Sequence, residues 1–451
     1  MIDYKKIREE EREPKWRALA EAIGGELGEE IVQAMKELYD EFSDELIDWF
    51  VDLYDSEVGG FYYSRSAKAT DGYLPDAEST QQALRFFSGS GLGGASMGEL
   101  TSYLPPSVKE KIRVFIKGLQ DPNGFFYHPQ WGKEFTDTKA SRRARDLGWC
   151  IHILSSMGEK PTYDTPNGYK GDGLLADGTP AKSASAAASG EQAPKSTVAI
   201  PPEMKDRESF EKFIGGLDIK NQSYSVGNLL TSISSQIAYR DEVLRSEGAD
   251  YSLTEILIGW LNENQNPENG TWHAETNYYA VNGLMKTSGV YGKANVMMPN
   301  AGKAVMSAID AMTTDEVPNA VTCVYNTWFA VERVIRHMRT LGGEESKAEA
   351  KKILAELRRR APEALRLTRE KLRVFRKECG SYSYCPTHSA TRSQGCPAAV
   401  ADAWEGDINA TIICSSDILN YIYAALDLYE YRVPIFSSAD AKRFYELIEA
   451  K

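Results

Sequence analysis

The chain is poor in cysteine, in long apolar runs and in basic charge, and each shortage excludes a class of protein. Its 451 residues include six Cys, too few for the disulfide framework of a small secreted protein. No run of 18 apolar residues occurs, so we expect neither a membrane-spanning helix nor a membrane partner. The 65 acidic residues exceed the 52 basic ones and give a net charge of -13, which argues against nucleic acid as a partner.

The N-terminal sequence also lacks the apolar segment of a secretory signal, because charged residues occur throughout MIDYKKIREEEREPKW. We therefore expect a cytoplasmic protein with free thiols. The length of the chain suggests two or three domains. A closed ring of helical hairpins, however, can reach this length as one domain.

Helical periodicity and a recurring turn organise the chain. Residues 28–54 carry apolar side chains at helical spacing, and a Gly pair at 59–60 ends that segment. The same order then recurs: an amphipathic helix, a turn of Gly and aromatic residues, and a helix of small and apolar residues. These turns begin at Gly60, Gly124, Gly270 and Gly380.

Six pairs of an outer and an inner helix fit this pattern. The outer helices are expected over residues 28–54, 108–119, 207–214, 253–261, 302–312 and 353–375. The inner helices are expected to begin near Pro75, Arg143, Glu275 and Asp407, or to cover residues 224–239 and 321–335. Because the inner helices lack a wide charged stripe, we expect them to be buried on most sides. The sequence thus predicts an all-α fold, a single α/α toroid of about six helical hairpins over residues 1–451, with an N-terminal helix within residues 1–25.

One long stretch does not fit a helix. Residues 160–205 are rich in Gly, Ser, Ala and Pro, and a loop of this length inside a compact domain is either mobile or functional. It is interpreted as a flexible surface excursion or as a lid over a pocket. The basic segment 347–377 is interpreted as the solvated face of an outer helix.

The turn sequences resemble those of known α/α-toroid enzymes. QDPNG at 120–124 and QNPENGTW at 265–272 are similar to turns of terpenoid cyclases and protein prenyltransferases, and also of six-hairpin glycosidases, polysaccharide lyases and sugar epimerases. The turn Gly59-Gly60-Phe61-Tyr62 favours the sugar-active members, and residues 55–84 as a whole resemble bacterial hypothetical proteins. This resemblance implies the toroid fold and, as the favoured expectation, a carbohydrate substrate.

A second resemblance keeps another chemistry open. The residues PDAEST at 75–80 are similar to the Asp-x-Asp-Asp motif with which class II terpene cyclases protonate an alkene. Here Glu78 and Ser79 stand at the third and fourth motif positions, which departs from the pattern. The alternative is therefore a terpenoid cyclase-like enzyme with Asp76 and Glu78 as its acid. No Asp-Asp-x-x-Asp diphosphate motif occurs, and no zinc triad of a protein prenyltransferase can be placed.

Acidic residues gather where the inner helices are expected to begin, at one mouth of the ring. Four of them are the candidate catalytic residues, Asp76, Glu78, Glu275 and Asp407. One explanation is helix capping, which contributes on the order of 1 kcal/mol per cap. The functional explanation is a pair of carboxylates, since glycoside hydrolysis needs one acid and one base or nucleophile. We expect Glu78 to be the acid and Glu275 or Asp407 its partner.

Aromatic, amide and charged residues near the same mouth fit a sugar site, because flat rings stack on sugar faces. Arg65, Arg143 and Arg145 can bind a uronic-acid carboxylate or pair with local acids. His128 and His273 occupy matching positions in two repeats and serve either as base or substrate contact, or as structural residues. The candidate substrate-binding residues are Tyr62, Tyr63, Arg65, Tyr127, His128, Trp131, Trp272, His273, Asn277, Tyr325, Asn326, Trp328 and Glu405.

A metal site is the weakest of these hypotheses. Thiolate and imidazole are zinc ligands, and the chain offers Cys379, Cys385, His388 and Cys396, but their spacing matches no common zinc motif. We therefore expect no metal and no cofactor. The sequence predicts a carbohydrate-active enzyme of the hydrolase, lyase or epimerase type, whose partner is a small molecule or oligosaccharide. The alternatives are the cyclase-like enzyme and a non-catalytic glycan-binding ring.

Overall fold

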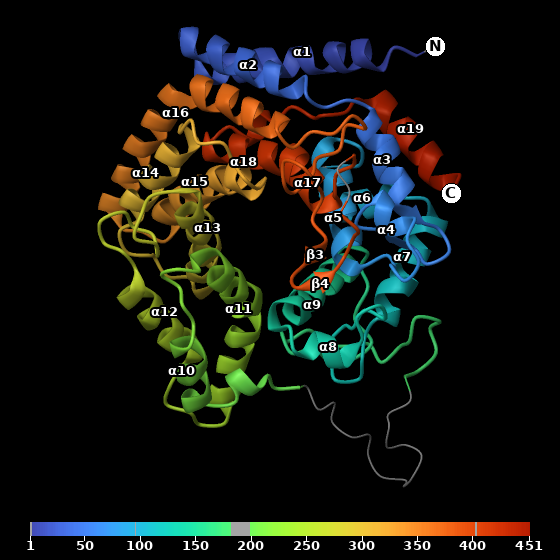
Figure 1. Cartoon of the computed structure of the whole chain (residues 1–451), viewed down its shortest axis with the longest axis vertical. Coiled ribbons are helices and arrows are strands. Elements are labelled where there is room, and N and C mark those ends of the chain that lie inside the picture. Colours follow the sequence, from blue (N-terminus) through green and yellow to red (C-terminus); the bar gives the residue numbers. More distant parts are fainter. Residues whose placement is uncertain (1, 95, 182–198, 402–403) are drawn as a thin grey trace.

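A computed structural model describes residues 2–94, 96–181, 199–401 and 404–451, and helices dominate it (Figure 1). In these ranges the only strands form two short antiparallel hairpins. One pairs β1 (Tyr54–Asp55) with β2 (Gly60–Phe61), and the other pairs β3 (Arg392–Ser393) with β4 (Cys396–Pro397). The predicted all-α class is confirmed. Among the described residues, every helix is too short or too polar to cross a membrane.

Helical segments surround the centre of the molecule in Figure 1. They are α5 (Ala77–Ser90), α9 (Ala140–Ser156), α11 (Ser223–Ser246), α13 (Tyr278–Ala294), α15 (Thr322–Thr340), and α17 (Ile408–Ile412), which continues through a π-helical turn, η2 (Ile413–Asp417), into α18 (Ile418–Ala425). Each contacts the next in chain order, from α5 through α15 to α18, and α17 returns to contact α5. The predicted inner segments fall on these helices.

A second set of helices lies outside the first (Figure 1). It comprises α3 (Glu45–Leu53), α7 (Pro106–Gly118), α10 (Arg207–Gly215), α12 (Leu253–Asn264), α14 (Ala301–Met312) and α16 (Glu344–Arg373). Helix α7 packs against α9, α12 against α11, α14 against α13 and α15, and α16 against α15. The basic segment predicted as an outer helix is α16, which buries Ile353, Leu357, Leu365 and Leu372 on its inner face.

One predicted helix is wrong. Residues 28–54 form two helices, α2 (Gly25–Tyr39) and α3, with a break at residues 40–44. The break has the sequence DEFSD, and Asp and Ser favour non-helical hydrogen bonding. Its Glu41 also accepts hydrogen bonds of 2.8 Å from both Arg369 and Arg373 of α16, so tertiary contacts fix the bend.

The remaining helices pack around these two sets and connect them. The predicted N-terminal helix is α1 (Tyr4–Ile23), which packs against α2 and the C-terminal α19 (Ser438–Glu449). Short helices α4 (Arg65–Lys68), α6 (Met97–Tyr103) and α8 (Lys133–Asp137) and the 3-10 turns η1 (Pro202–Met204) and η3 (Tyr429–Tyr431) complete the set. Buried apolar side chains from Trp16 to Ile448 form one continuous cluster.

Three of the four predicted Gly-aromatic turns begin with a glycine of positive φ, namely Gly124, Gly270 and Gly380, between 71° and 90°. In the first turn the positive φ, 86°, belongs to Gly59, one residue before Gly60. At Gly124 a side chain would also clash, because a Cβ there would lie 2.2 Å from the Asp164 carbonyl oxygen. The aromatic residues after these glycines are buried against the turns, as in Phe61 and Trp272.

The long loop falls partly outside the described residues, since 182–198 are not among them. Its first part packs against α7, where Lys117 Nζ lies 2.9 Å from Asp172 Oδ2 and Arg113 donates to the Ala176 carbonyl. Asn167 of the same part reaches the central cavity. A role of the loop as a lid stays a prediction.

Candidate functional site

A cavity of about 800 Å³ lies between the inner helices. Its lining includes Ser141, Tyr224 and Thr322 in the first turns of α9, α11 and α15, and Lys293 in the last turn of α13. Arg333, farther along α15, also lines it. Its volume is in the usual range for small-molecule and cofactor sites.

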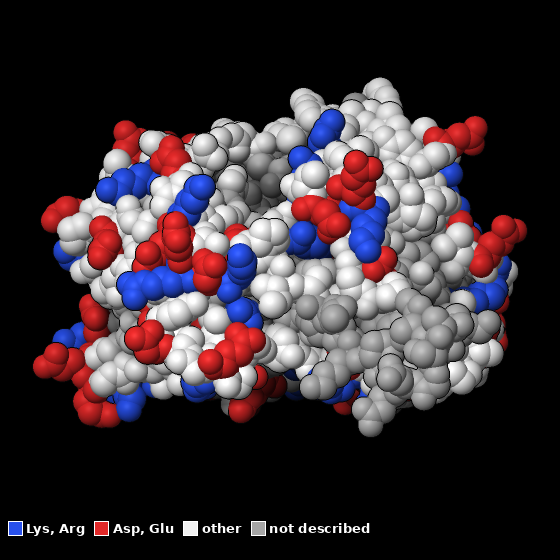
Figure 2. All heavy atoms as spheres, turned by 90° about the horizontal axis from the view of Figure 1, so that it is seen from below, with Lys and Arg blue, Asp and Glu red and all other residues white. Residues whose placement is uncertain are grey.

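The charges in this cavity are mostly of one sign. Its lining includes Arg85, Arg145, Lys286, Lys293, Arg333 and Arg392. Among the described lining residues Asp417 alone is acidic, and its Oδ2 lies 2.7 Å from Arg85. The outer surface differs, because acidic and basic side chains are intermingled on the face shown in Figure 2. A cation-rich cavity inside a protein of net charge -13 favours an anionic ligand.

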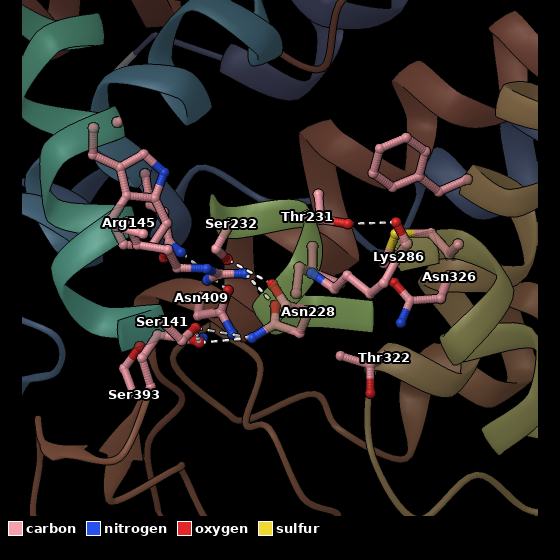
Figure 3. Close-up of a pocket in the computed structure, with 18 of the residues that line it drawn as sticks. Ser141, Arg145, Asn228, Thr231, Ser232, Lys286, Thr322, Asn326, Ser393 and Asn409 are labelled. Atoms are coloured by element: carbon pink, nitrogen blue, oxygen red, sulfur yellow. Dashed lines mark hydrogen bonds between the residues drawn. The ribbon is translucent and has the colours of Figure 1, made fainter. Parts of the chain in front are cut away.

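A hydrogen-bonded network fixes Arg145 on one wall (Figure 3). Its Nη2 donates to Asn228 Oδ1 of α11 over 2.9 Å. The Asn228 amide donates in turn to Gln394 Oε1 over 2.8 Å, and Gln394 also accepts from Ser141 over 2.6 Å. Gln394 belongs to the turn between β3 and β4, so this small hairpin links α9 to α11. The guanidinium of Arg145 also lies 5.0 Å from the centre of a Trp149 ring.

Lys286 approaches from the opposite wall. Figure 3 shows its side chain extending from α13 toward Arg145, with Asn228 and Ser232 of α11 between them. No hydrogen bond or ion pair joins its Nζ to a residue in the described part of the chain, and the Tyr224 ring lies 5.7 Å away. Burial, and then the positive charges of Arg145 and Arg333, lower the pKa of Lys286 well below its usual value.

Around Arg333 the cavity wall combines aromatic rings with charged side chains. Phe329 and Tyr421 stack with their ring centres 3.8 Å apart. The Arg333 guanidinium lies 4.0 Å from the centre of the Phe329 ring. Asp417, the partner of Arg85, lies in the π-helical turn η2, a type of helix irregularity that is frequent at functional sites.

A second, fully buried charge cluster lies behind the wall that carries Arg145. Arg142, with no exposed surface, is 2.7 Å from Glu78 Oε2 and 2.5 Å from Asp146 Oδ1. Glu78 is also hydrogen-bonded by Ser393 and by Gln82, and it lies 3.5 Å from Arg145. Glu78 is therefore the counter-ion of a buried arginine, and it does not line the cavity.

The other predicted catalytic residues also lie outside the cavity lining. Asp76 caps α5 by accepting from the Ser79 amide, and Asp407 caps α17 by accepting from the Ala410 amide. Asp407 further accepts from the amides of Tyr384 and Ala390, each over 3.0 Å. Glu275 is exposed to solvent. The structure does not bring the four predicted carboxylates together as a pair in the cavity, and the capping explanation holds for Asp76 and Asp407.

Three predicted substrate-binding residues line the cavity: Tyr63, Tyr325 and Asn326. The other ten lie elsewhere, namely Tyr62, Arg65, Tyr127, His128, Trp131, Trp272, His273, Asn277, Trp328 and Glu405.

Most of these ten make structural contacts. Trp272 and Trp328 are buried and donate to Leu261 and Thr368, and Trp131 donates to Pro397. Asn277 caps α13. Glu405 accepts from the backbone amide of Arg65, whose side chain is 2.7 Å from Asp52. Tyr62 and Tyr127 donate to Asp55 and Asp137.

The two matching histidines differ in environment. His128 is buried, its Nε2 lies 2.6 Å from the Pro75 carbonyl oxygen, and burial lowers its pKa to about 4. His273 is partly exposed, and its Nδ1 accepts from the Glu275 amide. His128 thus acts as a neutral structural donor.

The structure does not assemble the proposed zinc ligands. Among the described residues, which include Cys379, Cys385, His388 and Cys396, no group of three or more His, Cys, Asp or Glu side chains has the arrangement of a metal site. Cys379 contacts Ser381, and His388 contacts Thr387.

Several cavity residues escaped the sequence analysis, notably Asn228, Ser232, Lys286 and Asp417. A signal for them exists in the sequence. Polar residues recur at intervals of four on α9 and α11, as in Ser141 with Arg145 and Asn228 with Ser232. Residues four apart share one helix face, so such a pair marks the side that a polar cavity meets.

No family model, curated protein or solved structure matches this chain.

Proposed function

We propose that the chain is an α/α toroid of six helical hairpins that binds an oligosaccharide in its central cavity and acts on it as an enzyme. The closed order of contacts among the inner helices supports the ring. Each inner helix follows an outer one along the chain, in the pairs α3–α5, α7–α9, α10–α11, α12–α13, α14–α15 and α16–α17.

The observation that carries the carbohydrate assignment is the chemistry of the cavity wall. Amides, hydroxyls and aromatic rings are the groups that bind sugar hydroxyls and sugar faces. Two lining amide oxygens, Gln82 Oε1 and Asn326 Oδ1, are buried and have no hydrogen-bond partner among the described residues. A buried acceptor without a donor is costly, and a ligand hydroxyl would satisfy it. The stacked rings of Phe329 and Tyr421 offer an aromatic surface nearby.

The reaction we propose is of the lyase or epimerase type. A two-carboxylate hydrolase needs an acid and a second carboxylate on either side of the scissile bond. Asp417, the acidic residue of the described lining, is already ion-paired with Arg85. Proton abstraction beside a sugar carboxylate needs a base such as Tyr or Lys. The cavity offers Tyr63 and Tyr224 for that role.

The cyclase-like alternative has less support. A terpenoid cavity should be lined by apolar and aromatic side chains, whereas this one is rich in amides, hydroxyls and cations. Its proposed acid would be Asp76 and Glu78, but one is a helix cap and the other is paired with Arg142.

The test is ligand binding followed by turnover. Ligands that bind the native state raise the unfolding midpoint by mass action, so the purified chain is screened with neutral oligosaccharides, uronate oligosaccharides and prenyl diphosphates. We expect a rise with one oligosaccharide class. Tyr421→Ala should weaken that binding about 3- to 10-fold, the worth of one stacking contact. Tyr279→Ala, at an exposed position on α13, should leave it unchanged.

Turnover then separates an enzyme from a binding ring. Elimination from a uronate creates an unsaturated sugar whose ultraviolet absorbance can be followed directly, and epimerisation exchanges a sugar proton with solvent deuterium. Binding without either signal would leave a non-catalytic glycan-binding ring. A midpoint shift with prenyl diphosphates alone would reject the carbohydrate assignment.

A further inference from the structure

Two basic side chains face each other across the cavity, and the one acidic residue of the described lining, Asp417, is paired with Arg85 instead. Arg145 on α9 and Lys286 on α13 extend toward one another over Asn228 and Ser232 (Figure 3). Like charges repel, and the repulsion is stronger in a cavity of low dielectric than in water. Such an arrangement is stabilised when a negatively charged group binds between the two cations.

The nearest protein carboxylate is already occupied. Glu78 lies 3.5 Å from Arg145, but Arg142 is closer to it, at 2.7 Å, and Ser393 and Gln82 also donate to it. Glu78 therefore neutralises Arg145 only in part, and it sits behind the cavity wall. Arg145 retains guanidinium N–H donors beyond the one that Asn228 accepts, since an arginine has five.

The groups around the two cations fit a sugar acid better than an isolated inorganic ion. Asn228 and Ser232 lie between the cations, and Thr322 and Asn326 lie on the side of Lys286 (Figure 3). Hydroxyl and amide groups bind sugar hydroxyls, while a guanidinium binds a carboxylate through two parallel hydrogen bonds. Asn326 Oδ1 is also a buried acceptor to which no group in the described part of the chain donates.

We propose that Arg145 and Lys286 together bind the carboxylate of a uronic-acid residue, so that the substrate is an acidic oligosaccharide. This inference rests on the proposed function, because it names the substrate of the same cavity. Arg145 forms the directional contact, held in place by Asn228. Lys286 supplies the second charge from the opposite wall.

Proton uptake follows from this arrangement. In the free cavity the charged groups that act on Lys286 are Arg145 of α9, Arg333 of α15 and, with opposite sign, Glu78 of α5, while the Tyr224 ring of α11 lies beside it. The two arginines and burial favour the neutral amine. A bound carboxylate favours the charged form, so Lys286 takes up a proton as the sugar acid binds.

The experiment compares a uronate oligosaccharide with its carboxyl-reduced, neutral counterpart by isothermal titration calorimetry. We expect the acidic form to bind at least about 10-fold more tightly, since an Arg–carboxylate contact contributes about 1.5–3 kcal/mol. Arg145→Met and Lys286→Met should each remove most of that preference. Arg143→Met is the matched control, because Arg143 lies two residues away on α9 and outside the cavity lining.

Repeating the titration in buffers of different ionisation enthalpy measures the number of protons that the protein takes up when the ligand binds. The wild type should take up a fraction of a proton near neutral pH, and Lys286→Arg, which stays charged, should bind the acid with less uptake. Equal affinity for the acidic and neutral forms would overturn the carboxylate site and leave an oligosaccharide-binding cavity. Binding of neither form would reject the proposed function itself. An acid preference that survives both Met substitutions would also overturn the inference.

Discussion

Arg142 and Arg145 lie one turn apart on α9, yet they have opposite environments. Arg142 is fully buried and is bound by Glu78 and Asp146 within 2.7 Å. The Arg145 side chain is 19% exposed, donates a hydrogen bond to the Asn228 amide oxygen, and faces Lys286 across the cavity. A buried ion pair with complete partners is a structural element, whereas an incompletely neutralised cation at a cavity wall is available to a ligand.

The acidic residues near the inner-helix starts have structural roles. Glu78 and Asp146 belong to the Arg142 cluster, and Asp76 and Asp407 cap helices. These four acids therefore stabilise the scaffold, and cations, amides and hydroxyls make up most of the polar cavity lining. Carboxylates at the starts of the inner helices are therefore poor markers of the binding site in this protein.

The largest expected effect comes from removing the fully partnered arginine. Arg142→Met leaves Glu78 and Asp146 buried without their cation, which should lower the free energy of unfolding by about 3–5 kcal/mol. Arg145→Met should change it by less than about 1 kcal/mol, because water in the cavity can solvate what remains. Urea unfolding of both variants beside the wild type measures the difference. Equal losses would show that the two arginines are not separated into structural and binding roles.

Much of the fold was predictable because its determinants are local. Apolar periodicity and Gly-aromatic turns located most of the outer and inner helices, since helix formation and turn conformation depend on neighbours in sequence. The helix break at residues 40–44 was not predicted, because it depends on contacts of Glu41 with α16, more than 300 positions later in the chain. No local pattern encodes that contact.

The site was less predictable because a residue type does not reveal its partner. Asp407 precedes a helix, which suits a cap and a catalyst equally, and its acceptance of the Tyr384 and Ala390 amides emerges only in three dimensions. The cations are equally ambiguous in the sequence, because Arg143 and Arg145 both lie near the start of one inner helix, and only the orientation of α9 places Arg145 alone in the cavity lining. Lys286 stands out only once α13 is known to pack beside α11 and to line the cavity.

A pH-dependent effect should distinguish the Arg142 side of α9 from the cavity side. His128 lies beside the Arg142 cluster, and its pKa falls to about 4 in the folded chain, against about 6.5 when unfolded. Between these values the unfolded chain binds more protons, so stability falls as the pH falls from about 6.5 to about 4, by up to about 3 kcal/mol. His128→Gln, which can still donate to Pro75, should reduce that loss.

The exposed His388 supplies the control, since His388→Gln should leave the acid profile unchanged. His337 also has a pKa lowered to about 4 by burial, so some acid sensitivity should persist in the His128 variant. Chemical denaturation at pH 7, 5.5 and 4.5 measures these differences. An unaltered profile in His128→Gln would mean that His128 is already charged in the native state.

The smallest expected effect has the opposite sign. Lys286→Met removes a buried amine that Arg145 and Arg333 repel, so it should raise the free energy of unfolding by about 1 kcal/mol at neutral pH, as when a functional group is traded for stability. The gain should shrink as the pH rises toward about 10.4, because the unfolded chain then loses the proton that the native state already disfavours. Denaturation at pH 7 and 10 measures both values. A loss of stability in Lys286→Met would instead mean that the ammonium is held by a scaffold contact, and would place Lys286 with Arg142 rather than with Arg145.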